Sequence, residues 1–151
     1  MKAKDIMTRD VMSLSFESSV KEALDLLREK EISGLPVVDK EGKFLGMLTE
    51  KEILSRILPS YISKVGRFIY EENPKSTRKK LSEIVNLNVS QLMRKEATTT
   101  TEDVTLCEVA HIMLTHKSRR IPVLDKSGKM VGIVTRGDVL SAFMKEAAEI
   151  K

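Results

Sequence analysis

The sequence predicts an α+β fold built from two copies of one β-α-β-β-α unit. The segment Leu35–Lys43 recurs as Ile121–Lys129, an offset of 86 residues with no gap inside the unit. Each copy also has one helical apolar stripe and one pair of apolar segments around a turn. A fixed offset marks one structural unit used twice. We expect the copies to pack about a pseudo-twofold axis, with a groove between them that suits a ligand.

The composition restricts the class of protein. The chain has 41% apolar and 4% aromatic residues, so we expect a core of Ile, Leu, Val and Met. No apolar run approaches the roughly 18 residues of a membrane span, and the N-terminus lacks a signal-peptide apolar region. The lone Cys107 favours a reducing compartment, and we expect a cytoplasmic location. The net charge of +4 fits anionic ligands but is too small to indicate nucleic acid by itself.

Each copy is expected to begin with a short extended segment and a helix. In the first copy this segment is Val11–Leu14, and Ser18 or Ser19 can cap the helix that follows. Apolar residues then recur at i, i+3, i+4 and i+7, the spacing of one buried helical face. These are Val20, Ala23, Leu24 and Leu27, and in the second copy Leu106, Val109, Ala110 and Met113.

Two strands and a second helix complete each unit. The first copy has apolar segments Leu35–Val38 and Phe44–Thr49 around a turn at Gly42, which tolerates positive φ, and a helix begins at Glu50. The second copy has Ile121–Leu124, a turn at Gly128, Met130–Thr135 and a helix from Arg136 toward Glu149.

The order of these elements predicts a first repeat at 1–56, a helical connector at 57–88 and a second repeat at 89–151. Apolar residues in the connector predict helical packing interrupted near Pro59, a stop at Glu71–Pro74, and a further short helix. They are Ile57, Leu58, Ile62, Val65, Phe68 and Ile69, then Leu81, Ile84 and Val85. The basic run Lys75–Lys80 is either a solvated charged stretch or an element that binds a partner or nucleic acid.

Several segments carry a family resemblance. Asp5–Thr8, Gly34–Asp39 and Gly46–Thr49 resemble the CBS domain, named after cystathionine β-synthase, and Leu92-Met93, Arg120–Asp125 and Gly132–Asp138 repeat the pattern. Two such repeats form a Bateman module. The resemblance implies that the chain binds an adenosine-containing ligand in a cleft between the repeats. It also implies a homodimer that regulates another protein and catalyses nothing.

The segment Gly132–Asp138 is the sharpest candidate site. Thr135 can cap a helix whose free N–H groups and dipole favour phosphate, and the carboxylate of Asp138 can accept two hydrogen bonds from a ribose diol. The family's ribose-phosphate motif, Gly-x-x-Thr/Ser-x-x-Asp/Asn, has this form. Ile133, Thr135, Arg136 and Asp138 are therefore candidate ligand contacts. The alternative is that Thr135 and Asp138 are only a helix cap and a first-turn acid.

The first copy departs from this motif. Glu52 stands where Asp138 stands in the second copy, and its extra methylene places the carboxylate too far out or forces it aside. Glu50 in place of Arg136 also adds a negative charge where phosphate would approach. Thr49 and Glu52 therefore predict a weak second site.

The resemblance implies that the opposite repeat holds the adenine. The residues concerned are Val11, Ile32, Ser33, Gly34, Leu35 and Pro36, with Gly34 allowing close backbone approach. Ordinary strand structure is the alternative for each of them. Arg119 and Arg120 replace Ser33 and Gly34 of the first copy, and a guanidinium suits phosphate. A solvated basic loop is the alternative for these two.

Other chemistries find less support. Cys107 and His111 share a helical face, but their counterparts Lys21 and Asp25 look solvent-facing, so we expect no metal site, no catalytic residue and no required cofactor. The sequence thus predicts a regulatory module and not an enzyme. The expected ligand is AMP, ADP or ATP, and S-adenosylmethionine is the alternative. We expect it to bind a second copy of itself and an unknown effector protein, and we expect no association with a membrane. The alternative is a nucleic-acid-binding or transcription-associated regulator that uses the basic connector.

Overall fold

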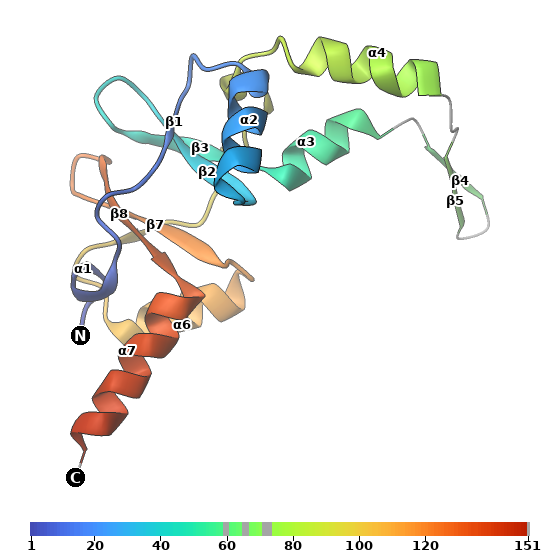
Figure 1. Cartoon of the computed structure of the whole chain (residues 1–151). Coiled ribbons are helices and arrows are strands. Elements are labelled where there is room, and N and C mark those ends of the chain that lie inside the picture. The colour runs from blue at the N-terminus through green and yellow to red at the C-terminus, as the bar shows by residue number, and fades with distance from the viewer. Residues whose placement is uncertain (59–60, 65–66, 71–73, 151) are drawn as a thin grey trace. The chain divides into compact units, whose positions relative to one another are not determined.

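The computed structural model describes residues 1–58, 61–64, 67–70 and 74–150 and contains both predicted units (Figure 1). The first copy has β1 (Leu14–Ser15), α2 (Val20–Lys30), β2 (Gly34–Val38), β3 (Phe44–Thr49) and α3 (Glu50–Ile57). The second has β6 (Thr100–Thr101), α6 (Leu106–Thr115), β7 (Arg120–Leu124), β8 (Met130–Thr135) and α7 (Arg136–Glu149). The α+β fold class and the β-α-β-β-α order are confirmed.

Each copy forms a three-stranded sheet. The strand orders are β1-β2-β3 and β6-β7-β8, with β6 parallel and β8 antiparallel to β7. The first strand of each copy is only two residues long, so the extended segment expected at Val11–Leu14 is mostly irregular. In both sheets this short strand lies at the edge, and short edge strands limit pairing with other chains.

The first long helix of each copy begins at a capping side chain. The Ser19 hydroxyl accepts a hydrogen bond from the Glu22 N–H at 3.1 Å, and Thr105 does the same for Glu108 at 3.3 Å. Such caps stabilise a helix by about 1 kcal/mol. The predicted stripes are buried at most of their positions, but Leu24 and Ala110 are only half-buried because they lie at the edge of the apolar face.

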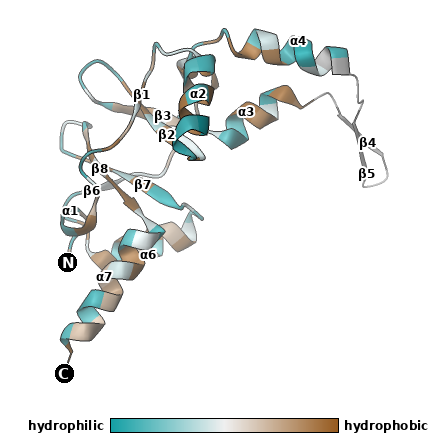
Figure 2. Cartoon of the chain, in the orientation of Figure 1, coloured by the Kyte–Doolittle hydropathy of each residue, from teal (hydrophilic) through white to brown (hydrophobic). Residues whose placement is uncertain are grey.

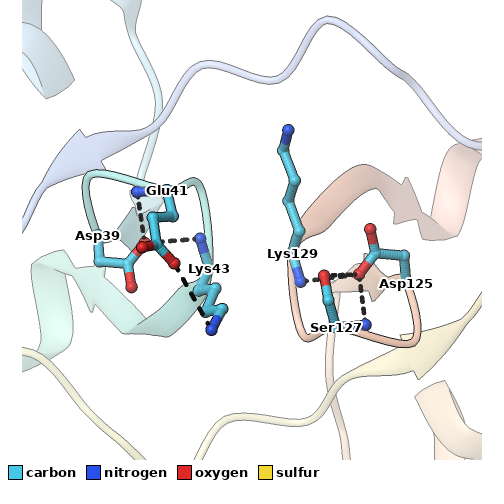
Figure 3. Close-up of polar contacts among 6 residues, drawn as sticks. All are labelled: Asp39, Glu41, Lys43, Asp125, Ser127 and Lys129. Atoms are coloured by element: carbon cyan, nitrogen blue, oxygen red, sulfur yellow. Dashed lines mark hydrogen bonds and ion pairs between the residues drawn. The ribbon is translucent and has the colours of Figure 1, made fainter.

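The turns between paired strands have the same construction in both copies (Figure 3). Oδ1 of Asp39 accepts the N–H of Lys43 at 2.9 Å, and Oδ1 of Asp125 accepts that of Lys129 at 3.0 Å. The glycines that close these turns have φ of +82° and +88°, as expected for a residue without a Cβ. A hydrogen bond from the Ser127 hydroxyl, above all, lowers the pKa of Asp125.

The two turns lie side by side (Figure 3), and backbone hydrogen bonds join them. The Phe44 N–H donates to the Gly128 carbonyl at 3.1 Å, and the Met130 N–H donates to the Gly42 carbonyl at 3.0 Å. The two donors, Phe44 and Met130, are 86 residues apart, and so are the two acceptors, Gly42 and Gly128, so equivalent positions have the same role in both bonds. The two turns are thus related by a local twofold exchange.

The chain divides into two compact units that do not coincide with the sequence copies. Unit 1 comprises Met1–Ser13, Val38–Leu45 and Glu96–Lys151, and unit 2 comprises Leu14–Val37 and Gly46–Lys95. Each unit has its own core. The core of unit 1 consists of Ala3, Met7, Leu106, Val109, Met113, Ile121, Val123, Val134, Val139 and Ala142. The core of unit 2 consists of Leu14, Val20, Ala23, Leu27, Leu35, Val37, Leu48, Ile53, Ile84, Val89 and Leu92.

A short helix ahead of each copy completes the core of the other copy. Helix α1 (Ala3–Ile6) lies in unit 1, where the Ala3 N–H donates to the Val104 carbonyl at 2.8 Å. Helix α5 (Val89–Leu92) lies in unit 2, where the Val89 N–H donates to the Ser18 carbonyl at 2.8 Å. A helix of one turn has no core of its own and depends on such packing.

The connector is only partly helical. Helix α4 (Pro74–Ile84) packs against α3, includes the basic run and buries Ile84. The helical packing expected at residues 61–64 and 67–70 is wrong, because β4 (Tyr61–Lys64) and β5 (Arg67–Tyr70) pair as antiparallel strands. The aromatic and β-branched residues of this segment favour strands. The expectations for Pro59, Val65 and Glu71–Asn73 lie outside the described residues.

Helix α4 also uses part of its basic run internally. The Lys80 ammonium donates to the Leu58 carbonyl at 3.2 Å, at the end of α3. This bond ties one of the basic side chains to the preceding helix. Within the residues that the structure describes, no helix is long and apolar enough to cross a membrane.

Candidate functional site

The predicted ribose-phosphate motif lies where β8 meets α7, in unit 1. Thr135 is the N-cap of α7, and its hydroxyl accepts the Asp138 N–H at 3.2 Å. In return, Oδ2 of Asp138 accepts the Thr135 N–H at 2.9 Å. This reciprocal capping box holds the carboxylate in one orientation. In the described part of the chain, Oδ1 of Asp138 makes no hydrogen bond, so it remains able to accept one from a ligand.

An open cavity of about 210 Å³ borders Asp138. Its lining residues all belong to unit 1: Met1, Asp5, Ile6, Asp138, Ser141, Ala142 and Lys145. Small-molecule pockets usually enclose about 300–1,000 Å³, so this cavity has room for only part of a nucleotide. Ser141 and Lys145 were missed in the sequence, although their spacing of three and seven residues from Asp138 places all three on one helical face.

Three arginines gather at the same strand-to-helix junction. The Arg136 N–H donates to the Arg119 carbonyl at 3.1 Å, and Arg120 pairs with Thr135 across β7 and β8. Arg119 and Arg136 are exposed and Arg120 is half-buried. The structure therefore brings the predicted phosphate contacts to the first turn of α7, where the helix dipole also favours anions.

Ile133 is less suited to polar contact with a ligand. Its N–H and carbonyl exchange two hydrogen bonds of 2.9 Å with Thr8, and its side chain is 9% exposed. Any contact with a ligand would therefore come from the little of its side chain that remains accessible. Val11, the other predicted contact in unit 1, is half-buried and lies between α1 and β1.

The residues predicted to hold adenine lie in unit 2. Ile32 is half-buried and Ser33 is exposed, whereas Gly34, Leu35 and Pro36 are buried in β2. Ile32 and Ser33 line a cavity of about 380 Å³, a usual ligand-pocket volume, with Leu24, Leu27, Arg28, Glu31 and Glu50. Leu24, Leu27 and Ile32 give this cavity an apolar wall that suits a flat ring.

The packing of β2 against β3 also requires a glycine at position 34, in addition to the predicted close approach of a ligand. A Cβ added there would lie 2.7 Å from Cγ2 of Thr49, so the absence of a side chain lets β2 and β3 approach. The Ser33 carbonyl accepts the Glu50 N–H at 2.9 Å, the counterpart of the bond between Arg119 and Arg136. The same backbone frame thus surrounds the helix start in both copies.

The acid of the first copy is held differently. Oε2 of Glu52 accepts the Thr49 N–H at 3.0 Å and a short hydrogen bond from the Thr49 hydroxyl. Oε1 lies 3.9 Å from Nε of Arg94. Glu52 is therefore engaged at both carboxylate oxygens, in contrast to Asp138.

Cys107 and His111 are both exposed on α6, and Nε2 of His111 lies 3.4 Å from the Thr115 hydroxyl. Among the residues that the structure describes, no group of three or more His, Cys, Asp or Glu side chains could hold a metal ion.

Comparison with known proteins identifies the family. A model of the CBS domain matches residues 3–59 and again residues 89–145. The chain belongs to the CBS-domain family. It is a CBS pair, because the two matches begin at positions related by the offset of the internal repeat.

Relatives of this CBS pair include proteins of different lengths. CBSX1, a chloroplastic CBS domain-containing protein of Arabidopsis thaliana, is 33% identical over 134 residues, which are 85% of this chain and 57% of CBSX1. Inosine-5'-monophosphate dehydrogenase of Aquifex aeolicus is 31% identical over 92% of this chain but only 24% of the enzyme. The chain thus spans about a quarter of that enzyme.

A solved structure of similar length is CBSX2 of Arabidopsis thaliana, a CBS-pair protein. Its complex with AMP matches this chain with a TM-score of 0.74 and 28% identity, covering 97% of this chain and 98% of CBSX2. The likeness extends over both repeats.

Proposed function

We propose that this CBS pair is a regulatory module that binds an adenine nucleotide, AMP, ADP or ATP, or a related adenosyl ligand such as S-adenosylmethionine. The junction of Thr135 and Asp138 carries the proposal: an oriented carboxylate for ribose stands at a helix N-terminus beside three arginines. The AMP complex of CBSX2 supports this ligand class. Within unit 2, the apolar wall of the cavity at Ile32 and Ser33 would suit an adenine ring, and Val11 in unit 1 is a further proposed ligand contact.

A thermal-shift screen with AMP, ADP, ATP and S-adenosylmethionine tests the proposal. A ligand present at 100 times its Kd stabilises the folded state by about 2.7 kcal/mol. One or more of the four is expected to raise the Tm. No shift with any of them at millimolar concentration would contradict nucleotide binding.

We propose further that the module regulates an effector protein in the cytoplasm and has no catalytic role. The similarity to the dehydrogenase covers only 24% of that enzyme, so it does not indicate the enzyme's activity here. Phosphate release from ATP is expected to equal that of buffer alone, and turnover above that rate would contradict a purely regulatory role.

Replacing Arg119 and Arg120 together with alanine is expected to weaken AMP binding and to leave adenosine binding nearly unchanged. Each desolvated charge-assisted hydrogen bond to phosphate contributes about 1.5–3 kcal/mol. Calorimetry with both ligands measures the difference. Equal losses for nucleotide and nucleoside would show that the loop matters only for folding, and Lys126→Ala, an exposed cation of the β7–β8 turn, serves as a control for net charge.

The last helix of each repeat supports a homodimer. Leu140 and Met144 of α7 are both more than half exposed, and so are their counterparts Leu54 and Leu58 at the end of α3. Figure 2 shows apolar segments along both helices. Residues four apart share a helical face, so each repeat presents the same apolar pair. A surface that is repeated within one chain suits a second copy, because a twofold interface uses the same patch on both partners.

The double variant Leu140→Gln and Met144→Gln is therefore expected to shift the dimer toward monomer. Light scattering at micromolar concentration measures the mass, and Glu149→Gln, a polar change on the same helix, should leave it unchanged. A wild-type protein that is already monomeric at this concentration would contradict the dimer.

A further inference from the structure

The carboxylate of Glu52 is nearly enclosed within unit 2. Its side chain is 13% exposed, and Oε2 is bound by the N–H and the hydroxyl of Thr49. A buried charge is costly unless it is paired. The partner of the remaining oxygen, Oε1, is the guanidinium of Arg94, whose Nε lies 3.9 Å away as an ion pair.

Arg94 is fixed at this position by its backbone. Its carbonyl accepts the Met47 N–H at 3.0 Å, and its N–H donates to the Met47 carbonyl at 2.8 Å. The second copy has the same exchange between Thr8 and Ile133, with both bonds at 2.9 Å. The backbone frame is therefore shared, and the copies differ in the side chain that it carries: arginine in one, threonine in the other.

This difference coincides with the difference between the two acids. In unit 2, the acid is Glu52 and the arginine neutralises its second oxygen. In unit 1, the acid is Asp138, the neighbouring position is the exposed Thr8, and Asp138 has no ion pair among the residues that the structure describes. An intramolecular cation 3.9 Å from this oxygen competes with a ligand for it, because its charge stabilises the carboxylate that a ribose hydroxyl would otherwise bind by donating a hydrogen bond.

We propose that Arg94 is the residue that closes the second nucleotide site. Its guanidinium forms an ion pair with Oε1 of Glu52, the oxygen that corresponds to the ligand-accepting oxygen of Asp138, so the first repeat already has a cation where a ligand would bind. The inference rests on the proposed function, since it assumes that the Asp138 junction binds a nucleotide. It also goes beyond that function, because it makes the number of sites per chain depend on one residue outside the binding motif.

The test removes the nucleotide site at Asp138 and then removes Arg94 from the proposed second site at Glu52. All variants carry Asp138→Ala, which eliminates the first site, together with Glu50→Arg and Glu52→Asp, which give the first repeat the acid and the cation of the second. One variant keeps Arg94 and the other adds Arg94→Thr. Calorimetry with AMP measures the number of sites per chain, and thermal melting confirms that each variant folds.

The expected result is no measurable AMP binding with Arg94 retained and one site per chain with Arg94→Thr. The reciprocal change, Thr8→Arg with Asp138→Glu in the wild-type chain, is expected to weaken AMP binding at the working site by at least about tenfold. Arg94→Lys, which keeps a cation, is expected to stay closed.

Three outcomes would overturn the closure. The first is binding of AMP with Arg94 retained, and the second is no binding by a folded Arg94→Thr variant while the wild type binds one AMP. The third is binding that is weakened by Arg94→Thr, because Arg94 would then contact the ligand. If neither the wild type nor any folded variant binds AMP, the proposed function fails and the closure fails with it.

Discussion

Replacing Asp138 with alanine is expected to abolish most AMP binding. The carboxylate is held by the Thr135 N–H at 2.9 Å, which leaves its other oxygen for a ribose hydroxyl. A hydrogen bond to a charged group contributes about 1.5–3 kcal/mol, and 1.4 kcal/mol corresponds to a tenfold change in Kd. The Kd measured by calorimetry should therefore rise by at least about tenfold.

The matched control is Glu52→Ala in the other copy. Both acids form a capping box with the threonine that starts their helix, so both variants lose the same kind of helix cap. Each variant loses the hydrogen bond that its carboxylate accepts from the threonine N–H, so their losses of stability are comparable. Only Asp138→Ala is expected to lose AMP binding. Two equal sites per chain, or a larger loss of binding in Glu52→Ala, would contradict the asymmetry.

The internal repeat predicted most of the fold because helix caps and turns form from the same neighbouring residues in both copies. Ser19 and Thr105 are both small hydroxyl residues three positions before a glutamate, and both cap a helix. Asp39 and Asp125 likewise build the same turn. Local chemistry of this kind is visible in a sequence, since the partners are only a few residues apart.

The exchange of the leading helices could not be predicted in the same way. Met7 and Met93 are equivalent in the sequence, but nothing local indicates that the first belongs to the core of unit 1 or that α5 packs on the first copy. A one-turn helix has little stability of its own, so tertiary contacts decide its position. The connector strands β4 and β5 were missed because short apolar runs fit either a helix or a strand.

In the candidate site, too, the residues that lie close together in the sequence were predicted and the distant ones were not. Asp138 and Thr135 were predicted because a motif of seven residues contains them both. The helical spacing of Lys145 from Asp138 is a signal that could have predicted it. Arg94 has no local signal, because it lies 42 positions from the acid that it contacts. The backbone pairing of Arg94 with Met47 holds Arg94 beside β3, in the same unit as Glu52.

Gly46→Ala is expected to cause the largest loss of stability. A Cβ at this position would lie 2.6 Å from the carbonyl oxygen of Arg94. That oxygen belongs to backbone and is bound by the Met47 N–H, so it cannot move aside without breaking a hydrogen bond. Overpacking of this kind costs about 1–3 kcal/mol, and the rigid neighbour favours the upper half of that range.

The expected loss can be checked by thermal melting against two other glycines. For a chain of this size, 1 kcal/mol shifts the Tm by about 2–4 °C, so Gly46→Ala should lower the Tm by roughly 4–12 °C. Gly132→Ala should lower it less, because its added Cβ would meet the Met7 side chain first, at 2.5 Å, and the backbone carbonyl of Thr8 only at 3.0 Å. Gly137→Ala, with only the Thr135 hydroxyl at 3.7 Å, should not lower it, since alanine favours the helix.

Gly46→Ala also tests the connection between fold and site. The glycine lets the Arg94 backbone lie against β3, and this position is what carries the guanidinium to Glu52. At temperatures where the Gly46→Ala variant is still folded, we therefore expect its Arg94 to be displaced from Glu52. Equal Tm values for Gly46→Ala and Gly137→Ala would show that the close approach of the two segments does not limit stability, and would remove the reason for a glycine at this position.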